Sequence, residues 1–254
     1  MAALKIADLC KNFGGVSAVA DFAMVQNENE ITGIIGPNGA GKTTVFNLIT
    51  GVYPVESGKI WFYGTEITGL PSHKITAIGI TRTFQNIRLF RNLTVLDNLK
   101  TAYGVKTHYS IWEEMVRFGT VKKEEKRVEE IAKGYLSYFG LEKYSEFFPY
   151  NLPYGLQRRL ELARALMADP KLLLLDEPGA GLNPREIHQL IDVLLRIQKE
   201  KNLSIIIVEH HMELVMNICR TIHVLNFGKK IAEGRPDEIQ QNEAVLQAYL
   251  GDQV

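Results

Sequence analysis

The sequence has little cysteine, no long apolar run and no excess of charge of either sign. Its 254 residues include only two cysteines, Cys10 and Cys219, which are too few for a disulfide framework and suit a reducing cytoplasm. We expect both to be buried apolar side chains. Lysine and arginine number 29, and aspartate and glutamate also number 29. This balance argues against a mainly electrostatic partnership with nucleic acid, so no nucleic acid partner is expected.

Several familiar sequence signals are also missing. No stretch approaches the ~20 apolar residues of a membrane helix, and the first eleven residues lack the apolar segment of a signal peptide. If the protein works at a membrane, something other than a membrane helix of its own must hold it there. The six histidines show no metal-binding spacing with another histidine or cysteine, so no zinc site is expected. The adjacent side chains of His210 and His211 are expected to point to different faces.

Short apolar runs that alternate with helical segments predict a mainly parallel α/β sheet. The runs expected to form its buried strands are Ile31–Ile35, Leu172–Leu175, Ile205–Val208 and Ile222–Leu225. In open sheets of this kind, ligands bind beyond the carboxyl ends of the strands. Lys42, Asp176, Glu177 and His210 all follow such ends, which makes them candidate site residues.

Other parts of the chain show different patterns. Three short strands of a small antiparallel sheet are predicted at Leu4–Leu9, Ala18–Val25 and Lys59–Tyr63. The middle of the chain, about residues 93–168, has few strand signals. Its charge-rich run Lys122–Glu130 is interpreted as a solvated helix face with opposite charges at helical spacing. From Pro236 onward the pattern predicts one amphipathic helix.

The segment GPNGAGKT matches the phosphate-binding loop pattern GxxxxGK[ST], between a predicted strand and a predicted helix. Its glycines let the backbone turn sharply and bring N–H groups onto phosphate oxygens. Lys42 would place a positive charge on the β- and γ-phosphates, and the Thr43 hydroxyl can ligate Mg²⁺. The alternative is an ordinary glycine-rich turn. The candidate nucleotide-binding residues here are Gly36, Pro37, Asn38, Gly39, Ala40, Gly41, Lys42, Thr43 and Thr44.

An acidic pair follows the second predicted strand of the parallel sheet. Asp176 would hold Mg²⁺ directly or through water, and Glu177 would orient or deprotonate the attacking water. The alternative is a buried strand that happens to end in two acidic residues. Together with the phosphate-binding loop, the pair favours a site that hydrolyses a nucleotide.

With these motifs in this order, the chain resembles the ATP-binding cassette of ABC transporters over nearly its whole length. The resemblance implies an α/β P-loop ATPase with a mostly parallel core sheet, a small antiparallel β subdomain and an inserted α-helical subdomain. It implies one cassette over residues 1–254. Its expected parts are a core of about 1–85 and 169–235, a helical subdomain of about 86–168 and a C-terminal helix of about 236–254.

The resemblance also implies roles for single residues. Phe13, in KNFGG, matches the aromatic residue that stacks on adenine, and Gln85, in RTFQN, matches the Q-loop glutamine. Asn183, in GAGLN, matches the D-loop, and His210 matches the switch histidine that contacts the γ-phosphate. The implied cofactors are ATP and Mg²⁺. The implied catalytic residues are Glu177 and His210, and the implied Mg²⁺ ligands are Thr43, Gln85 and Asp176.

The signature segment departs from the family pattern LSGGQ. Its residues here are Leu152, Pro153, Tyr154, Gly155 and Leu156, followed by Gln157. Pro153 replaces a serine whose hydroxyl, in the family, reaches the γ-phosphate on the other subunit. That lost contact is worth about 1.5–3 kcal/mol if nothing replaces it. We therefore expect the ATP site completed by this segment to be weaker than the other.

The family also implies partners, because the signature of one cassette covers the phosphate-binding loop of a second one. This second cassette is either another copy or a sister chain. The segments RTFQNIRLFRNLTVLDNL, DEPGAGLNPRE, VEHHMELVM and QAYLG resemble the branched-chain amino-acid importer group, in particular its G-type ATP-binding subunit. Such importers add membrane permease subunits and an external solute-binding protein. The chain would then lie at the cytoplasmic face of the membrane, held by the permeases.

In the family, the neighbourhood of the Q-loop forms a groove for a permease helix, so the resemblance implies this role for the apolar residues after Gln85. Ordinary core packing is an alternative. These residues are Ile87, Leu89, Phe90 and Leu93. Related cassettes in urea or amide import and in lipopolysaccharide export remain alternatives. A soluble ABC ATPase is a further one, but the chain has no basic surplus and no long heptad insertion. A non-hydrolysing regulatory role is a third alternative. The presence of both implied catalytic residues, Glu177 and His210, argues against it.

Overall fold

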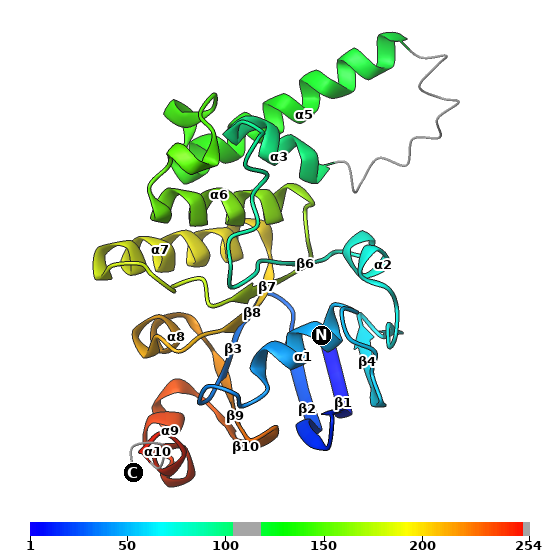
Figure 1. Ribbon diagram of the computed structural model, residues 1–254, viewed down its shortest axis with the longest axis vertical. Helices are drawn as coiled ribbons and strands as arrows, with labels where there is room; N and C mark the ends of the chain where they lie inside the picture. The colour runs from blue at the N-terminus through cyan, green and yellow to red at the C-terminus, as the bar shows by residue number, and fades with distance from the viewer. Residues whose placement is uncertain (104–117, 251–254) are drawn as a thin grey trace. The chain divides into compact units, whose positions relative to one another are not determined.

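The computed structural model describes residues 1–103 and 118–250, and the chain divides into two compact units (Figure 1). The first unit consists of Met1–Arg82 and Lys171–Val254, and the second is Thr83–Pro170. The expected helical subdomain, residues 86–168, falls inside the second unit. Among the described residues, no helix combines the length and apolar character that crossing a bilayer requires.

The larger sheet of the first unit has the strand order β10-β9-β3-β8-β7-β6. Its strands are β3 Ile31–Ile35, β6 Ile80–Arg82, β7 Leu172–Asp176, β8 Ser204–Val208, β9 Thr221–Asn226 and β10 Lys229–Gly234. All neighbours are parallel except β10, which pairs antiparallel with β9. The predicted parallel core is therefore confirmed. The sequence missed β6, which is too short to show a period, and β10, which carries no apolar run.

The smaller sheet is antiparallel, with the order β2-β1-β4-β5. Its strands are β1 Ala2–Phe13, β2 Val16–Asn27, β4 Ser57–Phe62 and β5 Thr65–Glu66. The predicted antiparallel sheet is present, but β1 and β2 are much longer than expected. Gly14 and Gly15 form the turn between them, with φ of 51° and 88°. Two positive φ values suit the tight hairpin turn that matches the twist of paired strands.

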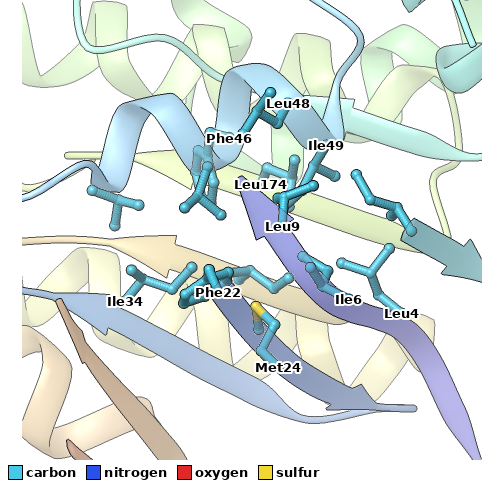
Figure 2. Close-up of a cluster of buried hydrophobic side chains, with 14 of the residues drawn as sticks. Leu4, Ile6, Leu9, Phe22, Met24, Ile34, Phe46, Leu48, Ile49 and Leu174 are labelled. Carbon is cyan, nitrogen blue, oxygen red and sulfur yellow. The ribbon is translucent and has the colours of Figure 1, made fainter. Parts of the chain in front are cut away.

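Helix α1, Lys42–Ile49, is anchored in the main apolar cluster of the first unit. Figure 2 shows Phe46 and Ile49 of α1 together with Leu9 of β1, Phe22 of β2 and Leu174 of β7. Fully burying one such side chain contributes about 1.5–3 kcal/mol. The cluster therefore fixes the helix whose first residue, Lys42, belongs to the phosphate-binding loop.

The other helices of the first unit are α2 Ser72–Ala77, α7 Pro184–Lys201, α8 Met212–Ile218, α9 Pro236–Gln240 and α10 Glu243–Leu250. The prediction of one C-terminal helix from Pro236 was wrong, because α9 and α10 are separate. Between them, the Asn242 side chain accepts a hydrogen bond from the Val245 amide at 3.2 Å. An asparagine used in this way starts a new helix, and this local contact outweighs the apolar period that runs through it.

The second unit is helical. It contains α3 Val95–Tyr103, α5 Phe118–Phe139, the short 3₁₀ helices η2 Glu142–Tyr144 and η3 Pro149–Asn151, and α6 Tyr154–Met167. Buried side chains from α3, α5 and α6 form its interior, among them Leu99, Leu136 and Leu160. The charge-rich run Lys122–Glu130 lies in α5, where Glu129 and Lys133 make an exposed ion pair of 2.6 Å.

Candidate nucleotide-binding site

The predicted phosphate-binding loop connects the end of β3 to the start of α1. Gly36, Gly39 and Gly41 have φ of 149°, 78° and 102°, a region that side chains avoid. A Cβ at Gly36 would also collide with the Leu225 carbonyl oxygen, and one at Gly41 with the Ala18 carbonyl oxygen. Only glycine fits these two positions, because the backbone there has a positive φ and there is no space for a Cβ atom. The loop is therefore packed between β2 and β9, and its backbone can approach a ligand bound at the loop closely.

Lys42 folds back over this loop. Its Nζ donates hydrogen bonds to the carbonyl oxygens of Gly36 at 2.7 Å and Pro37 at 2.9 Å. Burial lowers the pKa of Lys42, and the negative charges of Glu177 and Asp176 partly oppose this. The predicted loop lysine and the predicted acidic pair therefore interact electrostatically, as expected for residues of a single site.

The start of α1 carries no competing anion. Its N-cap is Gly41, which has no side chain to cap the helix, and its first turn holds no acidic residue. Thr43 is exposed, as are Asn38 and Gly39 of the loop. The first amides of a helix lack intrahelical partners and attract negative charge. This end of α1 is therefore suited to an anionic group such as a phosphate.

Asp176 ends β7 and faces an arginine that sequence reasoning missed. Arg82 Nη2 lies 2.6 Å from Asp176 Oδ2, with side chains only 5% and 2% exposed. Nη1 of the same guanidinium donates to Asn47 Oδ1 of α1 at 2.6 Å. Arg82 thus joins β6, β7 and α1 around the carboxylate. Arg82 opens the segment RTFQN, but its contact with Asp176 depends on strand β6, which the sequence did not predict.

The two predicted catalytic residues lie together. Glu177 follows β7 with φ of 47°, and its amide donates to the Val208 carbonyl oxygen at 2.8 Å. His210 follows β8, and its Nδ1 lies 3.8 Å from Glu177 Oε2. Glu177 is mostly buried, whereas the His210 side chain is about half exposed. The geometry leaves both groups at the carboxyl ends of adjacent parallel strands, where a ligand of this sheet would bind.

A second missed residue, Glu209, lies between β8 and His210. Its carboxylate accepts N–H bonds from Gly179, His210 and His211. The rings of His210 and His211 are 4.5 Å apart, so the expectation that they point to different faces was wrong. The backbone leaves the strand and turns here, which ends the alternation that this expectation assumed. Ligand atoms of Glu209 and the two histidines lie within 4.8 Å of one another, but the Glu209 oxygens already accept N–H bonds.

Two further predicted residues belong to the first unit. Phe13 ends β1, is 42% exposed, and makes an edge-on contact with the Tyr53 ring at a centroid distance of 5.2 Å. Asn183 caps α7: its side chain accepts from the Glu186 amide at 3.0 Å, and Glu186 accepts from the Asn183 amide at 2.9 Å. This capping box gives Asn183 a structural role, while its D-loop role stays a prediction.

Of the two cysteines, the structure buries only Cys219. Burial strongly raises the pKa of the Cys219 thiol. Cys10 is only half-buried, and its Sγ lies 3.3 Å from Asp21 Oδ1, so the prediction of a buried apolar residue was wrong for Cys10. Its place at an irregularity in the pairing of β1 explains the difference.

Gln85 and the signature segment lie in the second unit. The Gln85 side chain is exposed, and its carbonyl oxygen accepts a hydrogen bond from Arg158 of α6. Arg158 also donates to the Phe84 carbonyl oxygen at 3.0 Å and pairs with buried Glu161 at 3.0 Å. The helix that begins in the signature segment therefore holds the backbone of the Q-loop segment.

The signature residues themselves form the start of α6. Pro153 is the N-cap residue, and residues 154–157 form the first turn. The Gln157 side chain donates to the buried Leu152 carbonyl oxygen at 2.9 Å. No side chain caps this helix, so its first amides and its positive dipole end keep no built-in anionic partner.

The segment after Gln85 borders a cavity of about 470 Å³ in the same unit. Its lining residues are Arg88, Leu89, Phe90, Thr101, Ala102 and Arg164. Phe90 is 53% exposed, and the Arg164 guanidinium lies 5.4 Å from its ring centre. Buried Asn98 fixes this segment, because its side chain accepts from the Phe90 amide and donates to the Phe90 carbonyl oxygen. Of the four predicted groove residues, Leu89 and Phe90 line this cavity.

Comparisons with known proteins agree with this geometry. The profile of the ABC transporter family matches residues 19–180. A second profile, described as branched-chain amino acid ATP-binding cassette transporter, matches residues 229–254.

Three curated relatives cover nearly the whole chain. The high-affinity branched-chain amino acid transport ATP-binding protein BraF of Pseudomonas aeruginosa is 40% identical, over 98% of each chain. The LivG protein of Escherichia coli, with the same description, is 39% identical over 98% of each chain. The lipopolysaccharide export system ATP-binding protein LptB of Haemophilus influenzae is 31% identical over 100% of this chain and 99% of its own.

A solved structure shows the same architecture. The crystal structure of the ADP conformation of MJ1267, an ATP-binding cassette of an ABC transporter, is similar with a TM-score of 0.85 and 30% identity. It covers 99% of this chain and 99% of its own. The predicted P-loop ATPase fold is thereby confirmed. Fold, loop geometry and relatives agree that the chain belongs to the ABC transporter family, as one of its ATP-binding cassettes.

Proposed function

We propose that this chain binds and hydrolyses Mg-ATP to power an importer of branched-chain amino acids. The observation that carries the proposal is the convergence of Lys42, Asp176, Glu177 and His210 at the ends of three parallel strands. The 40% identity between this chain and BraF supports the transport role.

The triphosphate would bind at the loop between β3 and α1. Lys42 would exchange its contacts with the Gly36 and Pro37 carbonyl oxygens for phosphate oxygens, which also supply the counter-charge that a buried ammonium needs. The first amides of α1 would add N–H donors. Phe13, partly exposed at the end of β1, would stack on the adenine ring.

Two oxygen-bearing side chains of the first unit suit a magnesium ion. Carboxylate and hydroxyl oxygens are the ligands that Mg²⁺ prefers, and Asp176 and the exposed Thr43 supply one of each. Gln85 is the third proposed ligand. When bound, the cation would neutralise charge on the β- and γ-phosphates.

Glu177 and His210 would carry the hydrolysis. Glu177 Oε2 would take the proton of the attacking water, as a general base. His210 would donate a hydrogen bond to the γ-phosphate from a ring that already lies beside Glu177. The partly exposed position of His210 leaves it open to a ligand.

Completion of the site would require a second cassette, either another copy or a sister chain. The uncapped start of α6 would face the γ-phosphate bound on that partner. We therefore expect negligible ATP turnover by the dilute monomer. Because Pro153 offers no hydroxyl, the ATP site on the partner would be the weaker one.

The cavity beside Phe90 would receive a cytoplasmic helix of a permease subunit. Exposed Phe90 supplies the apolar anchor that helix-in-groove docking needs, and Arg88 and Arg164, which also line the cavity, supply positive charge. The permeases would hold the chain at the cytoplasmic face of the membrane, and an external solute-binding protein would deliver the solute.

The choice of solute rests on the relatives. BraF and LivG are 39–40% identical to this chain, against 31% for LptB, and the branched-chain profile matches the C-terminal residues. Lipopolysaccharide export is the second candidate, supported by the LptB relationship alone.

Reconstitution would test the proposal. The chain is isolated from detergent-solubilised membranes, its partners are identified by mass, and the complex is placed in ATP-loaded vesicles. We expect permease subunits, a cassette partner and ATP-dependent uptake of leucine, isoleucine or valine. Co-purification with lipopolysaccharide transport components would favour the second candidate, and ribosomes or DNA would refute the transport role.

A further inference from the structure

We infer that Glu209 is a positioning residue that holds Glu177 and His210 in register for hydrolysis. The inference rests on the proposed ATPase function. It starts from a carboxylate whose residue is 0% exposed and that lies between two loops carrying the proposed catalytic groups.

The two carboxylate oxygens of Glu209 serve different loops. Oε1 accepts from the Gly179 amide at 2.6 Å, in the loop after β7. Oε2 accepts from the amides of His210 at 2.8 Å and His211 at 3.0 Å, in the loop after β8. The Nδ1 atom of His211 also lies 3.2 Å from Oε2. One side chain therefore ties together the segments that follow two adjacent parallel strands.

Both tied segments lead directly to the reacting groups. Gly179 is two residues after Glu177, and His210 is the residue after Glu209. The 3.8 Å separation between Glu177 Oε2 and His210 Nδ1 is thus set by a short path through the Glu209 carboxylate. Because one side chain accepts N–H bonds from both loops, the link between them is short and direct.

Gly179 is shaped to accept the carboxylate. A Cβ there would lie 2.7 Å from Glu209 Oε1 and 2.9 Å from Ile187 Cδ1. A side chain at this position would push the carboxylate away from the Gly179 amide. Glycine at 179 and glutamate at 209 therefore act as a matched pair.

The hydrogen bonds of the Glu209 carboxylate go to Gly179, His210 and His211, whereas Lys42 donates to carbonyl oxygens of its own loop. A positioning role therefore predicts a specific result. Loss of the carboxylate should lower kcat and leave the affinity for ATP nearly unchanged. A merely structural role would weaken both together or lower the melting temperature alone.

The test uses the assembled complex with Glu209→Gln. The substituted amide keeps one acceptor oxygen but turns an NH₂ group towards amides that need an acceptor. We expect kcat for ATP to fall about 10–100-fold, the cost of misplacing reacting groups by about 1 Å. KM and the equilibrium affinity for ATP should stay within about twofold of the unaltered complex.

Glu213→Gln is the matched control. Glu213 lies four residues further on, is exposed, and contacts His188 at 3.3 Å. The control should leave kcat unchanged. Should Glu209→Gln fail to fold, Gly179→Ala gives the second test, because its methyl group displaces the same carboxylate and should lower kcat in the same way.

Unchanged kcat in the folded variant, or an equal loss of ATP affinity, would overturn the positioning role. If the unaltered complex itself fails to hydrolyse ATP, the proposed function is wrong. These two failures are distinguishable because the unaltered complex is measured first.

Discussion

Replacing Arg82 by methionine removes the guanidinium that faces Asp176. The pair is 2.6 Å apart with side chains 5% and 2% exposed, so water cannot take over its role. Removing one partner of a buried ion pair costs about 3–5 kcal/mol. The variant also loses the hydrogen bond to Asn47, which lies on α1. We expect Arg82→Met to lower the free energy of unfolding by about 3–5 kcal/mol in the absence of divalent cations.

Magnesium and nucleotide should reduce this loss. Asp176 is the proposed Mg²⁺ ligand, so a bound cation would supply the positive charge that the variant lacks. The difference in unfolding free energy between unaltered chain and variant should therefore shrink when Mg²⁺ and a non-hydrolysable ATP analogue are present. EDTA should restore the full difference.

Urea unfolding of the purified chain measures both quantities. Lys59→Met is the control, because Lys59 and Glu66 form a pair of 3.1 Å with side chains 58% and 44% exposed. An exposed pair contributes only about 0–1 kcal/mol. Equal small losses in both variants, or a loss for Arg82→Met that Mg²⁺ and nucleotide leave unchanged, would refute the reasoning.

Three further predictions concern other residues. Lys42→Ala should weaken ATP binding at least about tenfold in calorimetry, since it removes a charge-assisted contact of about 1.5–3 kcal/mol. Pro153→Ser should raise ATPase turnover of the assembled complex. An unchanged turnover would contradict the prediction that the ATP site completed by the signature segment is the weaker one. Burial lowers the pKa of His223 to about 4, although the Glu233 carboxylate at 3.3 Å opposes this. Because the unfolded chain takes up this proton near pH 6.5, stability should fall as pH drops from about 6.5 towards 4, by up to about 3 kcal/mol, and His223→Gln should flatten this slope in urea unfolding.

The sequence predicted the parts of the site that are local in the chain. The phosphate-binding loop is eight consecutive residues between a strand and a helix. The physical role of its glycines and of Lys42 can be inferred from the residue types alone. Asp176 and Glu177 follow an apolar run whose end is visible in the sequence. The parallel sheet then brings them towards Lys42, because the carboxyl ends of parallel strands meet at one edge.

Contacts between distant segments could not be predicted in this way. Arg82 reaches Asp176 across 94 positions, through a three-residue strand with no detectable period. Glu209 reaches Gly179 across 30 positions, where the chain has already left the regular strand. The separation of α9 and α10 was missed for another reason: the Asn242 cap is a local hydrogen bond that apolar spacing does not register.

The most direct test of the central claim is ATP hydrolysis by the assembled complex carrying Glu177→Gln in this chain. The variant should still bind Mg-ATP with nearly normal affinity, remain joined to its cassette partner, and release almost no phosphate from this site. Phosphate release at the unaltered rate would show that Glu177 is not the general base and would contradict the account.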